Sequence, residues 1–243
     1  MNKLRVVTYN VHKCRGLDGR VRPGRIAEVL QQIGGDIIAL QEVLSIPGGT
    51  RELDQSRFLA EELGMQLATG ETRQLRGGSY GNVVLTRHAL GAISQHDLSV
   101  TGHEPRGCLR ADVDVGQGKI VHVFNVHLGT AFLERRQQAR MLLEEQVIRN
   151  GALKGPRVVL GDFNEWTRGL ASRMLSSEFE SADIRTHLRK ARTYPGVMPF
   201  MHLDHIYYDN SLLVEHVTLH RTRAALIASD HLPLVADFAV REA

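Results

Sequence analysis

Val6-Val7-Thr8-Tyr9-Asn10-Val11-His12 is echoed later in the chain by Val121-His122-Val123-Phe124-Asn125-Val126-His127. Both stretches are rich in β-branched residues and predict buried strands. Each is followed by a helical pattern and then by an apolar strand that ends in an acid, Glu42 in the first unit and Asp162 in the second. The spacings from asparagine to acid are similar, 42 − 10 = 32 and 162 − 125 = 37 residues. The repeat predicts two related half-sandwiches packed face to face, whose polar strand ends meet at one rim. The alternative is chance similarity between two α/β units.

The rest of the chain also mixes strands and helices. Its length of 243 residues favours a single large α/β domain over residues 1–243. Helices are predicted from Pro23 to the Gly34-Gly35 pair and over 50–63, 134–149 and 169–176, with Gly64 stopping the second. Strands are predicted at 4–11, 36–43, 81–86, 92–100, 108–115, 119–127, 157–160, 203–208, 212–220 and 233–240.

Composition narrows the function classes. A formal net charge of +3 fits an anionic substrate but is too small for a dedicated nucleic-acid binder. Cys14 and Cys108 are the two cysteines, too few for a disulfide framework or a zinc site made of cysteines. The N-terminus shows no signal peptide, and no apolar run approaches the roughly 20 residues that span a bilayer. We therefore expect a cytoplasmic protein without a transmembrane segment.

Several predicted strands end in polar side chains where a strand interior would be apolar. These ends carry Asn10 and His12, Gln41 and Glu42, Asn125 and His127, Asp162 and Asn164, Asp204 and His205, and Asp230 and His231. A buried carboxylate without a partner costs several kcal/mol, so repeated acids at strand ends indicate a shared partner. A hard divalent cation is the simplest one, since Mg²⁺ needs only one or two carboxylates beside waters and a substrate phosphate.

Six segments, in order, resemble the endonuclease/exonuclease/phosphatase family. They are Thr8-Tyr9-Asn10-Val11-His12, Leu40-Gln41-Glu42-Val43, Gly81-Asn82-Val83-Val84-Leu85-Thr86, Asn125-Val126-His127-Leu128, Gly161-Asp162-Phe163-Asn164 and Ser229-Asp230-His231-Leu232-Pro233-Leu234. The family includes DNase I-like nucleases, abasic-site endonucleases, neutral sphingomyelinases and inositol polyphosphate phosphatases. The resemblance implies a DNase I-like four-layer α/β/β/α sandwich with two mostly antiparallel sheets.

The resemblance also implies a metal site. Glu42 would be the main ligand of Mg²⁺ or Mn²⁺, Asn10 would support it, and Asp230 would be a further ligand or lie just behind the ligands. Abasic-site nucleases usually carry Asp or Asn at the position of His12. The Asn-x-His form therefore resembles the sphingomyelinase-like and uncharacterised bacterial branches, and it leaves the number of metal ions open.

The resemblance to the family also implies catalytic roles for individual residues of this chain. By resemblance, Asp162 would orient or deprotonate the attacking water, and Asn164 would donate a hydrogen bond to the phosphoryl oxygens. His231, paired with Asp204, would stabilise or protonate the phosphate, and His127 would be a second phosphate-contacting imidazole. The expected substrate contacts are Arg106, Asn82 and His12, although Asn82 also fits a purely structural strand end.

The predicted function is hydrolysis of a phosphodiester of the nucleic-acid or phospholipid type by metal-dependent attack of water, by a monomeric enzyme. Two alternatives stay open: a phosphomonoesterase acting on a small ester, and a binding module that has lost catalysis. The second is disfavoured because every acid, base and amide position is filled. A serine hydrolase is set aside because the chain has no Gly-x-Ser-x-Gly. The apolar segment 194–201 and the basic run 187–192 are candidate rims of the site, although each also fits an ordinary packed or solvated surface.

Overall fold

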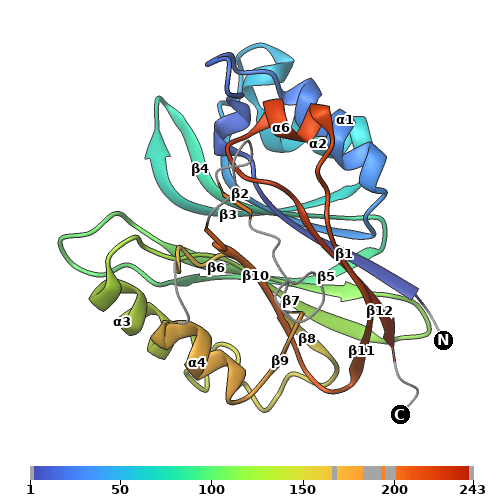
Figure 1. Cartoon of the computed structure of the whole chain (residues 1–243), viewed down its shortest axis with the longest axis vertical. Coiled ribbons are helices and arrows are strands. Elements are labelled where there is room, and N and C mark those ends of the chain that lie inside the picture. Colours follow the sequence, from blue (N-terminus) through green and yellow to red (C-terminus); the bar gives the residue numbers. More distant parts are fainter. Residues whose placement is uncertain (1–2, 166–168, 183–192, 195–200, 241–243) are drawn as a thin grey trace.

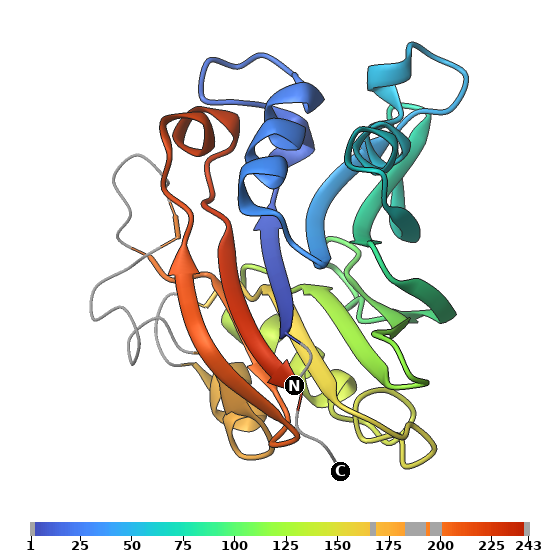
Figure 2. The same ribbon diagram turned by 90° about the vertical axis from the view of Figure 1, so that its right-hand side faces the viewer.

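The chain folds into two sheets packed face to face, with helices on both outer faces. The computed structural model describes residues 3–165, 169–182, 193–194 and 201–240. Figure 1 shows α1, α2 and α6 above one sheet and α3 and α4 below the other. The view in Figure 2 shows the strands of the two layers from the side. This is the predicted α/β/β/α sandwich.

Each sheet has six strands in the described part of the chain. In the first sheet the order is β11 (Leu212–Leu219), β12 (Leu234–Val240), β1 (Lys3–Asn10), β2 (Ile37–Ser45), β4 (Gly78–Thr86) and β3 (Gln66–Leu75). In the second sheet it is β5 (Ala89–Asp97), β6 (Gly107–Asp114), β7 (Ile120–His127), β8 (Arg157–Asp162), β10 (Asp204–Tyr208) and β9 (Glu180–Ser181).

The helices are short and lie outside the sheets. The first sheet is covered by α1 (Pro23–Ile33), α2 (Gln55–Leu63) and α6 (Arg223–Ala228), and the second by α3 (Phe132–Leu142) and α4 (Leu170–Ser176). Two 3-10 turns, η1 (His12–Cys14) and η2 (Arg51–Leu53), follow the C-terminal ends of β1 and β2. No helix among the described residues combines the length and the apolar character needed to cross a membrane.

The repeat seen in the sequence is a repeat of topology. β1 pairs with β2 in parallel across α1, and β7 pairs with β8 in parallel across α3. All other paired strands of the two sheets are antiparallel. Both parallel pairs lie in the middle of their sheets, so the C-terminal ends of all four strands point to one edge. That edge carries the polar strand ends.

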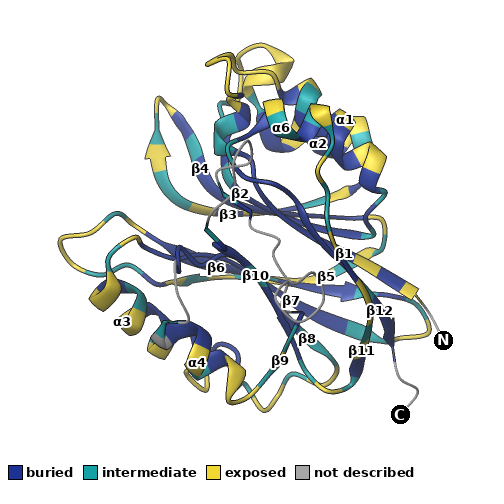
Figure 3. Ribbon diagram, viewed as in Figure 1, coloured by how far each residue is buried: buried dark blue, intermediate teal, exposed yellow. Residues whose placement is uncertain are grey.

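Three apolar cores separate the four layers. The largest fills the space between the sheets, and the other two lie between each sheet and its helices. Figure 3 shows the strands mostly buried and the outer helix faces exposed. Packing between the inner faces of the strands therefore sets the position of one sheet relative to the other. It thereby sets the distance between strand ends from different sheets.

Helix boundaries follow local chemistry. Pro23 begins α1, and Gly34 ends it at φ 66°, as predicted. The predicted helix over 50–63 begins only at Gln55, because Asp54 accepts a hydrogen bond from the Arg57 amide and forms the N-cap after η2. The helix predicted over 134–149 ends at Leu142, and the chain beyond it continues in turns.

Sequence patterns did not indicate β3, β9 or α6. β3 pairs only with β4 and exposes many polar side chains, so its periodicity is weak. β9 has two residues and α6 has six, which is too short for a periodic signal.

Asn125 ties the two sheets together beside the site. Its side-chain amide donates hydrogen bonds to the Leu40 and Val83 carbonyls, each at 2.9 Å, and its Oδ1 accepts one from Gln41 Nε2 at 2.8 Å. Asn125 is fully buried. These bonds join β7 of one sheet to β2 and β4 of the other, where the β2–β4 register shifts between Leu40 and Val43.

Asn125→Ala is expected to destabilise the fold by about 3 kcal/mol, because it removes three buried hydrogen bonds, those to the Leu40 and Val83 carbonyls and the one from the Gln41 amide. The measurement is urea unfolding followed by circular dichroism. Gln137→Ala, on the exposed face of α3, is the matched control and should change the free energy of unfolding by less than about 0.5 kcal/mol. A loss below about 1 kcal/mol for Asn125→Ala would show that the bridge is dispensable.

Candidate active site

Strand ends from both sheets converge on one buried carboxylate, Asp162. Its Oδ2 accepts a hydrogen bond from Asn10 Nδ2 at 2.9 Å and lies 3.6 Å from His127 Nε2 and 3.7 Å from His231 Nε2. Its Oδ1 accepts a hydrogen bond from the Asn164 amide at 2.9 Å. Asp162 is 1% exposed, so these partners replace water around the carboxylate.

Gly161 sets the approach of β8 to β7 at this point. Its φ is +147°, and a Cβ there would lie 1.8 Å from the Val126 carbonyl oxygen. Only glycine fits this position, and the strands meet in the register that pairs His127 with Asp162. The glycine of Gly161-Asp162 thus places the acid beside the imidazole.

Glu42 lies on a β-bulge of the other sheet. Its φ is +58°, an unusual conformation for a residue other than glycine. The carboxylate accepts hydrogen bonds from Asn10 Nδ2 at 3.2 Å and from Lys13 Nζ at 2.6 Å. Burial would raise the pKa of Glu42, but the neighbouring His127 and Lys13 side chains, with the hydrogen bonds from Lys13 and Asn10, hold the pKa well below its usual range. Glu42 is therefore ionised.

Asp204 and His231 form a buried pair on the other side of Asp162. His231 Nδ1 lies 2.9 Å from Asp204 Oδ2. Burial alone would lower the pKa of His231, but the carboxylates of Asp204 and Asp162 outweigh burial and raise the pKa to about 10. His231 is thus an imidazolium that donates to Asp204, and its other ring nitrogen faces Asp162.

His127 carries the opposite charge state. Burial, helped by the nearby Arg106, lowers the pKa of His127 to about 4. Burial also raises the pKa of Asp162, against the pull of the two imidazoles. At neutral pH one neutral and one charged imidazole therefore flank the same carboxylate.

Other predicted site residues lie around this centre. His12 Nδ1 is 3.3 Å from Asp230 Oδ1, and the Ser229 hydroxyl donates to the Asn10 carbonyl, which places Asp230 beside Asn10. The hydrogen bond from His12 lowers the pKa of Asp230, although burial opposes it. Arg106 is 7% exposed and pairs with Glu104 at 2.9 Å.

Two amides hold the frame of the site. Asn164 donates from Nδ2 to the Leu128 carbonyl at 2.9 Å. Asn82 donates from Nδ2 to the Gly107 and Asn125 carbonyls at 3.0 and 3.1 Å, between the sheets. In the structure Asn82 thus uses its amide hydrogens to join the sheets, and its contact with a substrate stays a prediction.

Sequence reasoning missed two neighbours of the site, Lys13 and Tyr80, and included a third, Tyr194, only as the first residue of a candidate rim. Lys13 contacts Glu42, Tyr80 lies beneath the Lys13 ammonium, and the ring of Tyr194 lies 4.8 Å from that of His231. The only signals were that Lys13 follows the Asn-x-His motif and that Tyr194 opens the apolar segment 194–201. Residues 195–200 of that segment and the basic run 187–192 lie outside the described residues.

The donor set fits a hard divalent cation. Glu42 and Asp230 are carboxylates close enough to influence each other, and the ammonium of Lys13 already lies as a cation on Glu42. Within the described ranges, no three His, Cys, Asp or Glu side chains form a complete metal cage. Mg²⁺ does not require one, because waters and substrate oxygens complete its octahedron.

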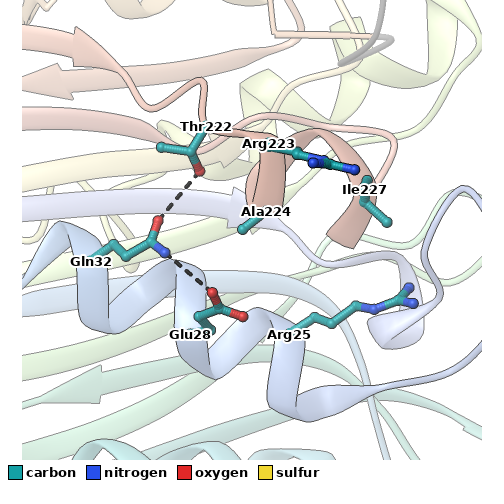
Figure 4. Close-up of a pocket in the computed structure, with 7 residues that line it drawn as sticks. All are labelled: Arg25, Glu28, Gln32, Thr222, Arg223, Ala224 and Ile227. Carbon is teal, nitrogen blue, oxygen red and sulfur yellow. Dashed lines mark hydrogen bonds between the residues drawn. The ribbon is translucent and has the colours of Figure 1, made fainter.

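A hollow lies away from Asp162, between α1 and α6 (Figure 4). Gln32 accepts from the Thr222 hydroxyl there at 3.3 Å and donates to Glu28 at 3.4 Å. None of the predicted site residues lines it. The hollow is thus separate from the cluster around Asp162.

The sequence matches a known family along most of its length. The profile of the Endonuclease/Exonuclease/phosphatase family matches residues 7–231. The uncharacterized protein YbhP of Escherichia coli strain K12 is 34% identical over 249 aligned positions, which cover 96% of this chain and 95% of YbhP.

Solved structures share the fold. An endonuclease/exonuclease/phosphatase from Beutenbergia cavernae is 25% identical, with a TM-score of 0.77 over 99% of this chain and 72% of that one. The mannosyl-6-phosphatase Bt3783 of Bacteroides thetaiotaomicron has a TM-score of 0.80 over 97% of this chain and 99% of its own. Its identity is 18%, so it supports the fold alone.

Asp204→Asn is expected to lower the pKa of His231, because the nearest negative charge is lost. The measurement is the pH titration of the imidazole signals by NMR. A raised folded pKa stabilises the fold below the unfolded value of about 6.5, and this stabilisation is lost as the pH rises toward the folded value. Asp204→Asn should therefore flatten the fall in stability over that range.

Asp112→Asn is the matched control for this titration. Asp112 pairs with His122 at 2.8 Å in the same buried geometry, but on a different part of the second sheet. It should leave the pKa of His231 unchanged. An unchanged His231 in Asp204→Asn would contradict the assignment of the imidazolium to this pair.

Proposed function

The chain belongs to the endonuclease/exonuclease/phosphatase family, and from this we propose that it is a divalent-metal-dependent hydrolase that cleaves a phosphodiester by attack of water. The observation that carries the proposal is the position of Asp162. This carboxylate lies between two imidazoles and shares the Asn10 amide with Glu42. The Asn10 side chain thus links Asp162, the proposed base for water, to Glu42, the proposed metal ligand.

Mg²⁺ or Mn²⁺ would be held by Glu42 and Asp230, with Asn10 fixing the Glu42 carboxylate. When bound, the cation supplies positive charge to the phosphoryl oxygens and to the leaving oxygen. The protein must keep Glu42 ionised for this, and the neighbouring His127 and Lys13 side chains favour that by lowering its pKa. The softer thiolate ligands that select other metals play no part, since Cys14 and Cys108 are buried in the apolar cores.

Asp162 would accept the proton of the attacking water. Its raised pKa makes it a stronger base than an exposed aspartate, because burial disfavours its charged form. Asn164 and Asn10 hold the carboxylate in place through its two oxygens. A carboxylate fixed in this way needs little rearrangement to take the proton.

His231 and Arg106 would stabilise the negative charge that develops on the phosphate. His231 is kept charged by Asp204, and Arg106 brings a guanidinium that can hold two oxygens at once. His127, neutral at pH 7, would act as a hydrogen-bond donor or as a proton carrier to the leaving oxygen. His12 would hold Asp230 and, with Asn164, contact phosphate oxygens.

We favour a phosphodiester over a small monoester, and DNA, RNA and phospholipids are the substrate classes to test. Salt dependence separates them: hydrolysis of a nucleic acid should weaken steeply with salt, while that of a small ester should not. A monomeric state and a cytoplasmic location stay predictions.

Glu42→Gln is expected to abolish the Mg²⁺- or Mn²⁺-dependent hydrolysis, because the amide cannot supply the negative charge that binds the cation. The measurement is turnover of bis-p-nitrophenyl phosphate, plasmid DNA, an abasic oligonucleotide and a phospholipid, each with metal or with EDTA. Glu145→Gln, an exposed glutamate, should retain wild-type turnover. Absence of metal-dependent turnover on every substrate would favour a binding module or an untested ester.

Asp162→Asn is expected to lower kcat by about 10²- to 10⁴-fold while the protein still binds Mg²⁺, because the base is lost and Glu42 is kept. Steady-state kinetics and metal titration measure the two effects separately. Asp114→Asn is the control, because Asp114 lies at the end of β6 that is farther from Arg106. If Asp162→Asn bound metal more weakly but kept the wild-type kcat at saturating metal, Asp162 would be a ligand and not the base.

A further inference from the structure

We propose that Lys13 is a displaceable counterion of Glu42: it holds this carboxylate until a divalent cation takes its place, and its freed ammonium then binds a phosphate oxygen of the substrate. The inference rests on the proposed function, since it assigns a role in the same site. The relevant contact is the one between Lys13 Nζ and Glu42 Oε2 at 2.6 Å.

The backbone around Lys13 is strained and held in place. His12, Lys13 and Cys14 have φ values of 45°, 58° and 53°, three consecutive left-handed residues without a glycine. Such conformations cost of order 1 kcal/mol or more each, so the surroundings must enforce them. The Cys14 amide donates to the Val11 carbonyl at 2.8 Å, and Gln55 Nε2 of α2 donates to the Lys13 carbonyl at 2.8 Å.

Asn10 links this turn to the catalytic cluster. Its Oδ1 accepts from the His12 amide at 3.0 Å, while its Nδ2 donates to Glu42 and Asp162. The side chain that orients Glu42 therefore also orients the turn that carries Lys13. The contact between ammonium and carboxylate is thus built by the fold.

The pair is the more exposed part of the site. The Lys13 side chain is 29% exposed and that of Glu42 is 19% exposed, whereas Asp162 and Asp204 are almost fully buried. A hydrated cation therefore has access to the Glu42 oxygens from solvent. A flexible four-carbon stem lets the ammonium leave without any change in the backbone.

A second contact is ready for the displaced ammonium. Lys13 Nζ already lies 5.7 Å from the centroid of the Tyr80 ring, within the range of a cation–π interaction. Tyr80 is 3% exposed and lies in β4. The Arg73 guanidinium also contacts this ring, at 4.8 Å from its centroid. The ammonium can therefore leave Glu42 and stay beside the site, where a phosphate would complete its contacts.

This arrangement gives two effects of opposite sign. Lys13 competes with the metal for the same carboxylate and repels it, so removing the ammonium should tighten metal binding. The same removal takes a point charge away from the phosphate, so it should weaken anion binding. A lysine that only supported the turn would not produce this opposition.

The experiment is calorimetric titration of the purified chain, first with Mg²⁺ and then, at saturating Mg²⁺, with inorganic phosphate. In Lys13→Met we expect Mg²⁺ to bind on the order of tenfold more tightly and phosphate on the order of tenfold more weakly than in the wild type. Lys13→Arg, which keeps the charge, should stay close to the wild type in both. Arg22→Met removes one charge from the exposed residue that directly precedes α1 and should change neither value.

Two results distinguish this inference from the proposed function. If the wild type binds Mg²⁺ and Glu42→Gln does not, but Lys13→Met binds it no more tightly than the wild type, this inference alone is overturned. If neither the wild type nor Lys13→Met binds Mg²⁺, the proposed function falls and this inference with it. Thermal unfolding checks that each variant is folded, and Lys13→Gln replaces Lys13→Met if the latter is not.

Discussion

The contact on which the site depends is the Asn125 bridge between the sheets. In a regular strand Gln41 and Glu42 would point to opposite faces, and Glu42 would be directed toward the helices. A bulge at this point re-aims the side chain, and its price is a strained backbone at Glu42. Asn125 reaches from the opposite sheet to the Leu40 and Val83 carbonyls and to Gln41, so the second sheet secures the bulge of the first.

Asn10 links the two sheets a second time, through the carboxylates of the site. It donates to Glu42 of its own sheet and to Asp162 of the other, so one amide is hydrogen-bonded to both carboxylates. Different neighbours shift the pKa values of the two acids in opposite directions. The His127 and Lys13 side chains lower the pKa of Glu42, while the burial of Asp162 outweighs its imidazoles and raises its pKa. This difference is what the proposed roles require, a carboxylate for a metal and a base for water from two similar strand ends.

Much of this arrangement was predictable from the sequence, in part from the repeat and in part from the resemblance to the family. The repeat predicted two related half-sandwiches whose polar strand ends meet at one rim, and the resemblance implied the four layers and the residues of the site. The structure confirms the four-layer fold and places Asn10, Glu42, His127, Asp162, Asp204 and His231 together. Their chemical roles stay predictions, since proximity alone does not assign them.

The residues that escaped prediction depend on geometry that composition does not encode. Nothing in the letters His12-Lys13-Cys14 indicates three left-handed residues, because that conformation is usually associated with glycine or asparagine. Of the seven non-glycine residues with positive φ in the described part of the chain, five lie at the site: His12, Lys13, Cys14, Glu42 and Asn164. Strain concentrated there has to be sustained by packing elsewhere, and the three apolar cores and the Asn125 bridge supply it. The site is therefore the part of the molecule least determined by local sequence preference and most dependent on the rest of the fold, which is why a turn such as that of Lys13 becomes visible only in three dimensions.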